Sequence, residues 1–303
     1  VFQRNRPPLP PPQNPVQWAS FFHPTATMSK ADHILRVVSL NLNGLRAAYS
    51  KGVLDWMQAS DADVFCLQET RLQSHQWLDA HKPPLWYTHL FPAQRPGYAG
   101  TALYSRLPLV EIRDGLGFAS CDEEGRFCQA TVVHPSGARV DVASAYFPSG
   151  SSGEAAQAKK DGFLLELLPR LQRWREQCRS LILCGDVNIA HKAIDLKNWR
   201  SNQMNSGFLP HERAWMDALI DQVGWVDAFR VLNRQPEQYS WWSNRGQAWA
   251  KNVGWRIDYH LVTPDWRGAV SAVSVYKDQR FSDHAPVVID YDLNRRAPLK
   301  DLL

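Results

Sequence analysis

The chain has 303 residues, of which 44% are hydrophobic, and 13 of them are tryptophans, so it can bury a substantial core. The formal net charge is +4, and residues 1–28 carry two arginines and no acid, so the remainder holds 32 basic and 30 acidic side chains. This excess of basic residues is too small to indicate nucleic-acid binding from the total charge. The sequence contains no run of about 18 apolar residues, so no membrane span is predicted.

The first 28 residues contain seven of the 20 prolines. Proline fixes φ and lacks a backbone donor, so we predict a disordered, proline-rich extension over 1–28. The two arginines leave a targeting role open, and Met28 is an alternative start. We expect residues 29–303 to form a single catalytic domain.

Short apolar and β-branched runs follow along the rest of the chain, and several are continuous rather than alternating, as in strands covered on both faces. These predicted strands are 35–40, 62–67, 100–105, 139–147, 180–185, 256–263, 269–276 and 286–292. The stretch 131–146 has the pattern of a hairpin. The five cysteines lack metal-ligand spacing, and Cys66 and Cys184 lie within apolar runs, which indicates buried thiols and a cytoplasmic location.

Helices are predicted between these strands. Apolar residues from Leu45 to Trp56 share one helical face, and Leu164, Leu167, Leu168, Leu171 and Cys178 share a face of a longer helix after 150–162. Ser151 and Glu154 are its predicted capping box. A third helix follows Pro210. The mixture of elements predicts one α/β unit with two packed sheets and helices outside them.

Polar side chains recur at the ends of the predicted strands, which is where α/β proteins build sites. They are Asn41, Asn43, Glu69, Tyr146, Asp186, Asn188, Asp258, Asp283 and His284. Singly, each has an ordinary explanation: asparagines form turns, Glu69 can be a solvated strand end, and tyrosines pack. Asp258 is the exception, because a carboxylate within an apolar strand is costly to bury unless it is paired.

Together these residues indicate phosphodiester hydrolysis. If Asp258 binds one ring nitrogen of His284, the other nitrogen faces a cleft with its tautomer set. No serine or cysteine at a strand-to-helix elbow accompanies the pair, so acyl transfer fits poorly. One carboxylate, Glu69, with amide neighbours suits Mg²⁺, which keeps several waters and binds substrate phosphates.

The residues also resemble a known family, the exonuclease III family of apurinic/apyrimidinic endonucleases, in its bacterial form. The resemblance runs from about Leu35 to Asp290 and is carried by SLNLNGLRAA, LQET, GTALYSR, AYFPSG, GDVNIAH, SGFLPHERAWMD, YSWWSNRGQAWAKNVGWRIDYHLV and SDHAPV. It implies the deoxyribonuclease I-like fold, a four-layer α/β sandwich of two packed mixed β-sheets flanked by helices. It also implies Mg²⁺ dependence and DNA repair.

The resemblance assigns a role to each position. Asp186 resembles the base that positions water, Asn188 would orient the phosphate or the leaving oxygen, and Tyr146 would contact the phosphate. His284, held by Asp258, would stabilise charge on a phosphate oxygen. Glu69 and Asn43 would face the metal, with Asn41 and Asp283 supporting them. Some relatives have Asp in place of Asn43, so fewer ligand charges are implied here, with Mn²⁺ as an alternative ion.

Residues 239–256 hold four tryptophans and three basic residues without an acid. Aromatic rings interleaved with cations fit stacking and phosphate binding, although Trp241 and Trp242 fit core packing equally well. By resemblance, Trp255 lines a pocket for a flipped abasic sugar. The predicted DNA-binding residues are Trp255, Arg245, Lys251, Arg256, Lys197 and Arg200.

These observations predict a Mg²⁺-dependent DNA repair phosphodiesterase that cuts 5′ to abasic sites and has 3′ to 5′ exonuclease or 3′-end trimming activity. We expect a monomeric cytoplasmic enzyme, used at the bacterial nucleoid, whose partner is double-stranded DNA with abasic sites or blocked 3′ ends. The alternatives are a lipid or inositol-phosphate phosphodiesterase of the same fold and a non-catalytic DNA-binding module.

Overall fold

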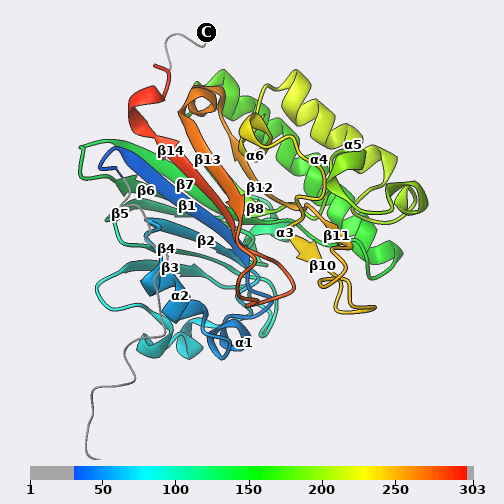
Figure 1. Ribbon diagram of the computed structural model, residues 1–303, viewed down its shortest axis with the longest axis horizontal. Helices are drawn as coiled ribbons and strands as arrows, with labels where there is room; N and C mark the ends of the chain where they lie inside the picture. The colour runs from blue at the N-terminus through cyan, green and yellow to red at the C-terminus, as the bar shows by residue number, and fades with distance from the viewer. Residues whose placement is uncertain (1–30, 299–303) are drawn as a thin grey trace, which may run out of the picture. The chain divides into compact units, whose positions relative to one another are not determined.

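The computed structural model describes residues 31–298, and two six-stranded sheets form its centre (Figure 1). The first sheet has the order β13-β14-β1-β2-β4-β3, and the second has the order β5-β6-β7-β8-β12-β9. Only β1 with β2 and β7 with β8 pair in parallel among these strands, so both sheets are mixed. A separate two-stranded ribbon joins β10 and β11.

The strands of the first sheet are β1 (Ile34–Asn41), β2 (Val64–Gln68), β3 (Tyr87–Phe91), β4 (Thr101–Ser105), β13 (Val270–Val275) and β14 (Val287–Asp292). Those of the second are β5 (Leu109–Asp114), β6 (Phe127–Val133), β7 (Arg139–Tyr146), β8 (Ile182–Asp186), β9 (Val226–Asp227) and β12 (Asp258–Val262). The ribbon consists of β10 (Trp241–Trp242) and β11 (Gly254–Trp255).

The helices are α1 (Leu45–Tyr49), α2 (Val53–Ala59), α3 (Ala119–Asp122), α4 (Glu154–Glu176), α5 (Pro210–Asp217) and α6 (Ala228–Leu232). A π-helical turn, η5 (Ala218–Gln222), continues α5. The remaining helical turns are η1 (Ser74–Gln76), η2 (Asp79–His81), η3 (Ala193–Asp195), η4 (Trp199–Asn202), η6 (Pro264–Ala269) and η7 (Leu293–Arg295).

Apolar side chains divide these elements into four layers. Val37 and Val64 of the first sheet share a buried cluster with Val142 and Ile182 of the second, so the sheets pack face to face. On the outer side of the first sheet, α1 and α2 bury their apolar residues, and on the outer side of the second sheet α4 and α5 do the same. The predicted four-layer sandwich is therefore confirmed.

All eight predicted strands are present, and the predicted hairpin is β6 and β7. The edge strands β3 and β5 lacked a recognisable pattern, because much of each remains outside the core. The predicted capping box of Ser151 with Glu154 is wrong: α4 begins after Gly153, whose φ of 110° sets the entry without a side-chain cap. Gly52, with φ of 82°, separates α1 from α2.

The predicted extension at 1–28 lies outside the described residues, and the single domain at 29–303 likewise stays a prediction at both ends. Within residues 31–298, no helix has the length and apolar character needed to cross a membrane.

Candidate active site

Strand direction explains why the polar strand ends meet. β1 and β2 run in parallel, so their carboxyl ends reach the same edge of the first sheet, and β7 and β8 do the same in the second. The antiparallel β12 starts at this edge with Asp258 opposite Asp186, and β14 starts there just after His284. The two sheets therefore bring polar residues from six segments to one place.

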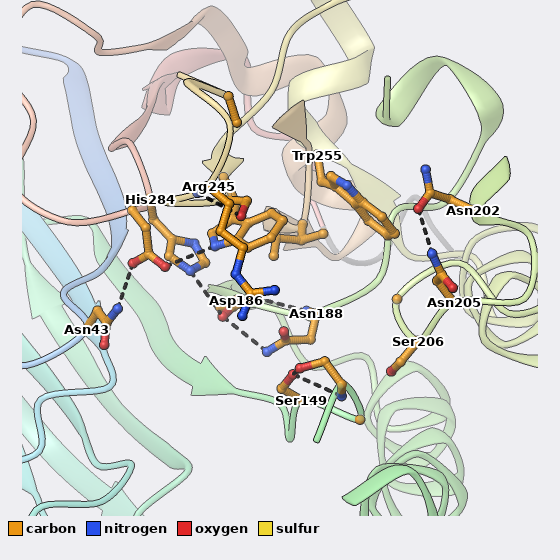
Figure 2. Close-up of a pocket in the computed structure, with 18 of the residues that line it drawn as sticks. Asn43, Ser149, Asp186, Asn188, Asn202, Asn205, Ser206, Arg245, Trp255 and His284 are labelled. Atoms are coloured by element: carbon orange, nitrogen blue, oxygen red, sulfur yellow. Dashed lines mark hydrogen bonds and ion pairs between the residues drawn. The ribbon is translucent and has the colours of Figure 1, made fainter. Parts of the chain in front are cut away.

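A cleft of about 950 Å³ opens at this edge (Figure 2). Ten of the predicted site residues line it: Asn43, Glu69, Tyr146, Asp186, Asn188, Lys197, Arg245, Trp255, Asp283 and His284. Asn41 and Asp258 are buried behind its wall and touch lining residues. The structure thus brings together all nine predicted polar residues.

Asp258 and His284 form a hydrogen-bonded pair. The imidazole Nδ1 lies 2.9 Å from Oδ2 and 3.1 Å from Oδ1 of Asp258, and Ser240 Oγ donates to the same carboxylate at 2.6 Å. Burial alone would lower the pKa of His284, but the carboxylates of Asp258 and Asp186 raise it to about 10. Nδ1 therefore donates to Asp258, which leaves Nε2–H directed toward the cleft. The pair joins the two sheets, because His284 precedes β14 of the first sheet and Asp258 begins β12 of the second.

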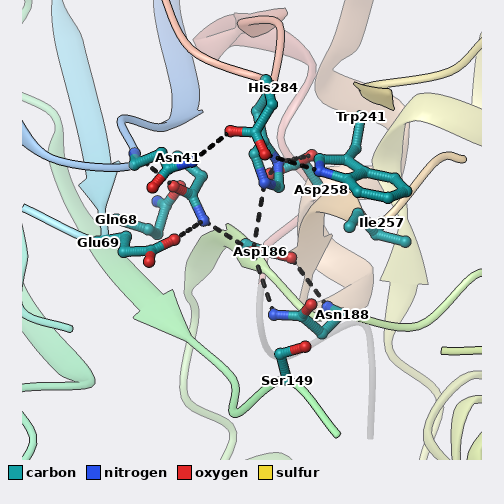
Figure 3. Close-up of polar contacts among 12 residues, drawn as sticks. Asn41, Gln68, Glu69, Ser149, Asp186, Asn188, Trp241, Ile257, Asp258 and His284 are labelled. Atoms are coloured by element: carbon teal, nitrogen blue, oxygen red, sulfur yellow. Dashed lines mark hydrogen bonds and ion pairs between the residues drawn. The ribbon is translucent and has the colours of Figure 1, made fainter. Parts of the chain in front are cut away.

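Asp186 ends β8 and is 1% exposed. Figure 3 shows the side chains of Asn41, Asn188 and His284 around it. Its Oδ2 accepts hydrogen bonds from Asn41 Nδ2 at 2.8 Å and Asn188 Nδ2 at 3.1 Å, and its Oδ1 accepts from the Asn188 N–H at 2.9 Å. His284 Nε2 lies 3.9 Å from Oδ2. Burial raises the pKa of Asp186 to about 7, against the opposing effect of His284. This value suits a group that accepts a proton near neutral pH.

Glu69 faces Asp186 across Asn41. Asn41 Nδ2 donates to Glu69 Oε2 at 3.1 Å as well as to Asp186, so one amide links two carboxylates. The other oxygen, Glu69 Oε1, accepts from Arg71 Nε at 3.0 Å. Sequence reasoning missed Arg71, which also lines the cleft; its only signal was a basic residue two positions after the acid.

Asn43 and Asp283 form a second contact between segments distant in sequence. Asn43 Nδ2 donates to Asp283 Oδ1 at 2.8 Å, and Trp241 Nε1 donates to Asp283 Oδ2 at 3.1 Å. Burial opposes ionisation of Asp283, but His284, Asn43 and Trp241 lower its pKa overall. Asp283 therefore remains ionised beside Asn43.

Tyr146 follows the same edge at the end of β7. It is 8% exposed, and burial together with Glu69 and Asp186 raises its pKa well above the usual range. The guanidinium carbon of Arg126 lies 4.8 Å from its ring centroid. The phenol therefore remains protonated in the cleft and available as a donor.

Among residues 31–298, Asp186, Asp258 and His284 form a group whose ligand atoms all lie within 4.8 Å of one another, close enough to hold a metal ion. Because Nδ1 of His284 is engaged by Asp258, an ion bound by this imidazole would take Nε2 in place of its proton. The oxygens of Glu69 and Asp186 on either side of Asn41 form an alternative donor set.

An aromatic wall closes the far side of the cleft. The rings of Trp241 and Trp255 meet edge to face with centroids 6.4 Å apart, and Ile257 lies beside them in the lining. Trp242 is 1% exposed and packs against Trp249, so the packing interpretation holds for Trp242 while Trp241 faces the cleft. Asn202, Asn205 and Ser206 form the rim next to Trp255, and no pattern in the sequence had identified them (Figure 2).

The predicted basic residues separate into two groups. Arg245 and Lys197 line the cleft, although Lys197 also pairs with Glu237. Arg200 and Lys251 are exposed outside the lining, and the guanidinium of Arg200 covers Trp199.

The prediction that Arg256 binds DNA is wrong. Arg256 is 1% exposed, with Nε 2.8 Å from Asp195 and Nη2 2.7 Å from Asp227, so its charge is neutralised inside the protein. It alternates with Trp255 and Ile257, which face the cleft, while its own side chain turns inward.

The comparisons with known proteins agree with this geometry. The model of the endonuclease/exonuclease/phosphatase family matches residues 38–284. The chain belongs to this family. It is 35% identical over 265 residues to an exodeoxyribonuclease of Bacillus subtilis (strain 168), covering 84% of this chain and 98% of that protein.

Solved structures of the family have the same fold. An AP endonuclease from Leishmania major matches with a TM-score of 0.73 and 26% identity, covering 88% of this chain and 89% of that one. The 3′ phosphatase NExo from Neisseria, bound to product DNA hairpin, matches with a TM-score of 0.74 and 26% identity, covering 85% and 99%. The present chain is therefore a hydrolase of the exodeoxyribonuclease and AP endonuclease type. The predicted resemblance is confirmed.

Proposed function

We propose that this nuclease hydrolyses the backbone of double-stranded DNA 5′ to abasic sites in base excision repair, with 3′ to 5′ exonuclease or 3′-end trimming activity. The observation that carries the proposal is the arrangement of Asp186 and His284. A buried carboxylate with a pKa near 7 lies 3.9 Å from an imidazole that Asp258 holds in one orientation. A base and a hydrogen-bond donor are thus placed side by side, as attack of water on a phosphodiester requires.

In this reaction Asp186 takes the proton of the attacking water, whose oxygen forms the new bond to phosphorus. The bond from phosphorus to O3′ breaks, and the leaving oxygen takes a proton from solvent. Nε2–H of His284 and the hydroxyl of Tyr146 donate to the phosphate oxygens, and the Asn188 amide orients the phosphate or the leaving oxygen. Because negative charge grows on these oxygens, fixed donors lower the barrier.

A hard divalent cation fits the residues present. Glu69 and Asp186 place carboxylate oxygens on either side of one amide, with Asn43 and Asp283 adjacent, and Mg²⁺ prefers oxygen ligands of this kind. We assign Glu69 and Asn43 to Mg²⁺, with Asn41 and Asp283 as supporting residues and Mn²⁺ as a substitute. When bound, the ion would supply positive charge to the phosphate.

The aromatic and basic side chains of the cleft support DNA as the substrate. Trp255 and Trp241 would receive a baseless sugar, which leaves the base stack at low cost, and Arg245 and Lys197 would contact phosphates. The related NExo was solved with a DNA hairpin, which supports the same class of ligand for this chain.

Cleavage assays test the proposal. Purified protein is incubated with an abasic-site duplex, a duplex with a 3′ mismatch, and sphingomyelin, each with Mg²⁺ or with EDTA. We expect incision of the abasic duplex with Mg²⁺ and none with EDTA. An abasic duplex left intact with both Mg²⁺ and Mn²⁺ contradicts the proposal, and cleavage of sphingomyelin alone favours a lipid phosphodiesterase. DNA binding without cleavage favours a non-catalytic module.

A further inference from the structure

A fully buried ion pair lies directly behind the cleft. Lys160 of α4 and Glu212 of α5 are both 0% exposed, and Lys160 Nζ is 2.6 Å from Glu212 Oε1. Lys160 is on the same helical face as Leu164, Leu167 and Leu171, which pack against the second sheet. A charged lysine at such a position loses its hydration, so it is stable there only with specific hydrogen-bonding and charged partners.

One partner is the backbone of a site residue. Lys160 Nζ donates to the carbonyl oxygen of Asn188 at 2.7 Å. Asn188 has φ of 56°, a conformation that L-residues rarely adopt, and its N–H and side-chain amide both bind Asp186. Lys160 fixes the backbone of Asn188 at its carbonyl group. The backbone N–H and the side-chain amide of the same residue are therefore held against Asp186.

The other end of the pair holds the rim of the cleft next to Trp255. Glu212 Oε2 accepts from the N–H of Gly207 at 2.7 Å and from that of Leu209 at 2.9 Å. These bonds hold the end of the segment 202–207, which lines the cleft through Asn202, Asn205, Ser206 and Gly207.

Gly207 joins this rim to the aromatic wall. Its φ is 92°, and a Cβ there would lie 3.1 Å from the Trp255 ring and 3.2 Å from the Asn188 carbonyl oxygen. Its own carbonyl accepts from the Ala190 N–H at 2.8 Å. The segment therefore packs closely against both Trp255 and the Asp186–Ala190 turn, with Lys160 and Glu212 underneath.

We propose that Lys160 and Glu212 are positioning residues for the phosphodiesterase reaction. Lys160 places Asn188 beside Asp186, and Glu212 holds the 202–207 rim against Trp255. This inference rests on the proposed function, because it assigns the pair to the same reaction. Neither side chain lines the cleft, so both act through the backbone that they bind.

Loss of the Lys160 contact and loss of the Glu212 contacts should have different kinetic effects. Loss of the Lys160 donor displaces groups around Asp186, so kcat falls while KM changes little. Loss of the Glu212 carboxylate frees the rim that contacts the substrate, so KM and the dissociation constant of DNA rise more than kcat falls. A variant that is only less stable should keep the wild-type kcat, KM and dissociation constant when these are referred to the concentration of folded protein.

Steady-state kinetics on an abasic duplex test this. Lys160→Met should lower kcat roughly 10- to 100-fold, the effect expected of a displacement of about 1 Å at a reacting group. Glu212→Leu, which removes the acceptor of the Gly207 and Leu209 N–H groups, should weaken binding of the duplex, measured by fluorescence anisotropy in EDTA. The double variant Lys160→Met/Glu212→Leu removes both charges, so no buried ion is left alone, and it should combine both defects while keeping a native near-UV spectrum.

Arg36→Met is the matched control. It breaks the ion pair of Arg36 with Asp290 at the far end of β1, so it should lower Tm but leave kcat and KM unchanged. A double variant with wild-type kcat and affinity overturns the inference. A double variant that fails to fold also overturns it, because the pair then serves stability. The same kinetic losses in the Arg36→Met control overturn it as well. If the wild-type protein does not cleave the duplex, the proposed function fails instead. The anisotropy measurement then still tests whether Glu212 contributes to DNA binding.

Discussion

The imidazole of His284 and the carboxylate of Asp258 lie 2.9 Å apart, although one precedes β14 of the first sheet and the other begins β12 of the second. The contact joins the two sheets at the edge where the cleft opens. It also sets which ring nitrogen faces the cleft, since Nδ1 is occupied by the carboxylate.

Replacing Asp258 by Asn should therefore lower kcat strongly. The amide no longer stabilises the protonated ring and permits the other tautomer, so the donor toward the phosphate is lost; a loss of roughly 10²-fold or more is expected. Single-turnover cleavage of an abasic duplex measures it. Asp265→Asn, which removes a buried carboxylate remote from the cleft, controls for lost stability. A wild-type single-turnover rate for Asp258→Asn would contradict the role of the pair.

Asp186→Asn should abolish turnover and leave DNA affinity largely intact. The amide cannot accept the proton of the water, but it has nearly the same size and does not add negative charge near the phosphate. Gel-shift titration in EDTA gives the affinity, and product formation gives the rate. Parallel loss of binding would show that Asp186 serves the substrate rather than the water.

Glu69→Gln should weaken Mg²⁺ binding roughly 10-fold or more, because it removes a charge from the proposed ligand set. Isothermal titration calorimetry without DNA measures this independently of activity. Glu111→Gln, on the exposed ion pair with Arg139, is the control. If His284→Asn instead of Glu69→Gln abolishes Mg²⁺ binding, the ion belongs to the group of Asp186, Asp258 and His284.

Arg245 and Arg256 should behave in opposite ways. Arg245→Gln should weaken DNA binding and reduce the salt slope of log K by about 1, with little change in Tm, because the residue lines the cleft. Arg256→Met leaves Asp227 buried without this partner and Asp195 with Arg230 as its remaining partner, and it should destabilise the fold by on the order of 3–5 kcal/mol. Urea unfolding and salt titrations separate the two. An unchanged salt slope for Arg245→Gln would remove it from the interface.

His260 should make the fold sensitive to mild acid. Burial lowers its pKa to about 4, from an ordinary 6.5, so below pH 6.5 the unfolded chain binds more protons than the folded one. Stability is then lost as pH falls from 6.5 toward 4, by about 2 kcal/mol at pH 5. Urea unfolding at pH 7 and pH 5 measures the change, which should shrink in His260→Asn. An equal loss in the variant would assign the effect to other groups.

Much of this architecture was predictable because the signals were local. Continuous apolar runs identified β1, β2, β8 and β12, since these strands are covered on both faces. The polar residues at their ends were equally visible. The edge strands β3 and β5, the true start of α4 and the break at Gly52 were not predicted, because they depend on partial exposure and on backbone conformations with positive φ.

By itself, the sequence determined the fold class and the residue types of the site, because hydrophobic periodicity and strand-end motifs are properties of short segments. Only the tertiary structure decided how these residues are distributed between the two sheets, the cleft and the core. It placed the predicted pair of His284 and Asp258 across two sheets, buried Arg256 between two aspartates, and placed Lys160 beneath Asn188. The physical reason is that a charged side chain has the same letter in a cleft and in a core, and only packing and the available partners decide whether its charge serves a ligand or the fold.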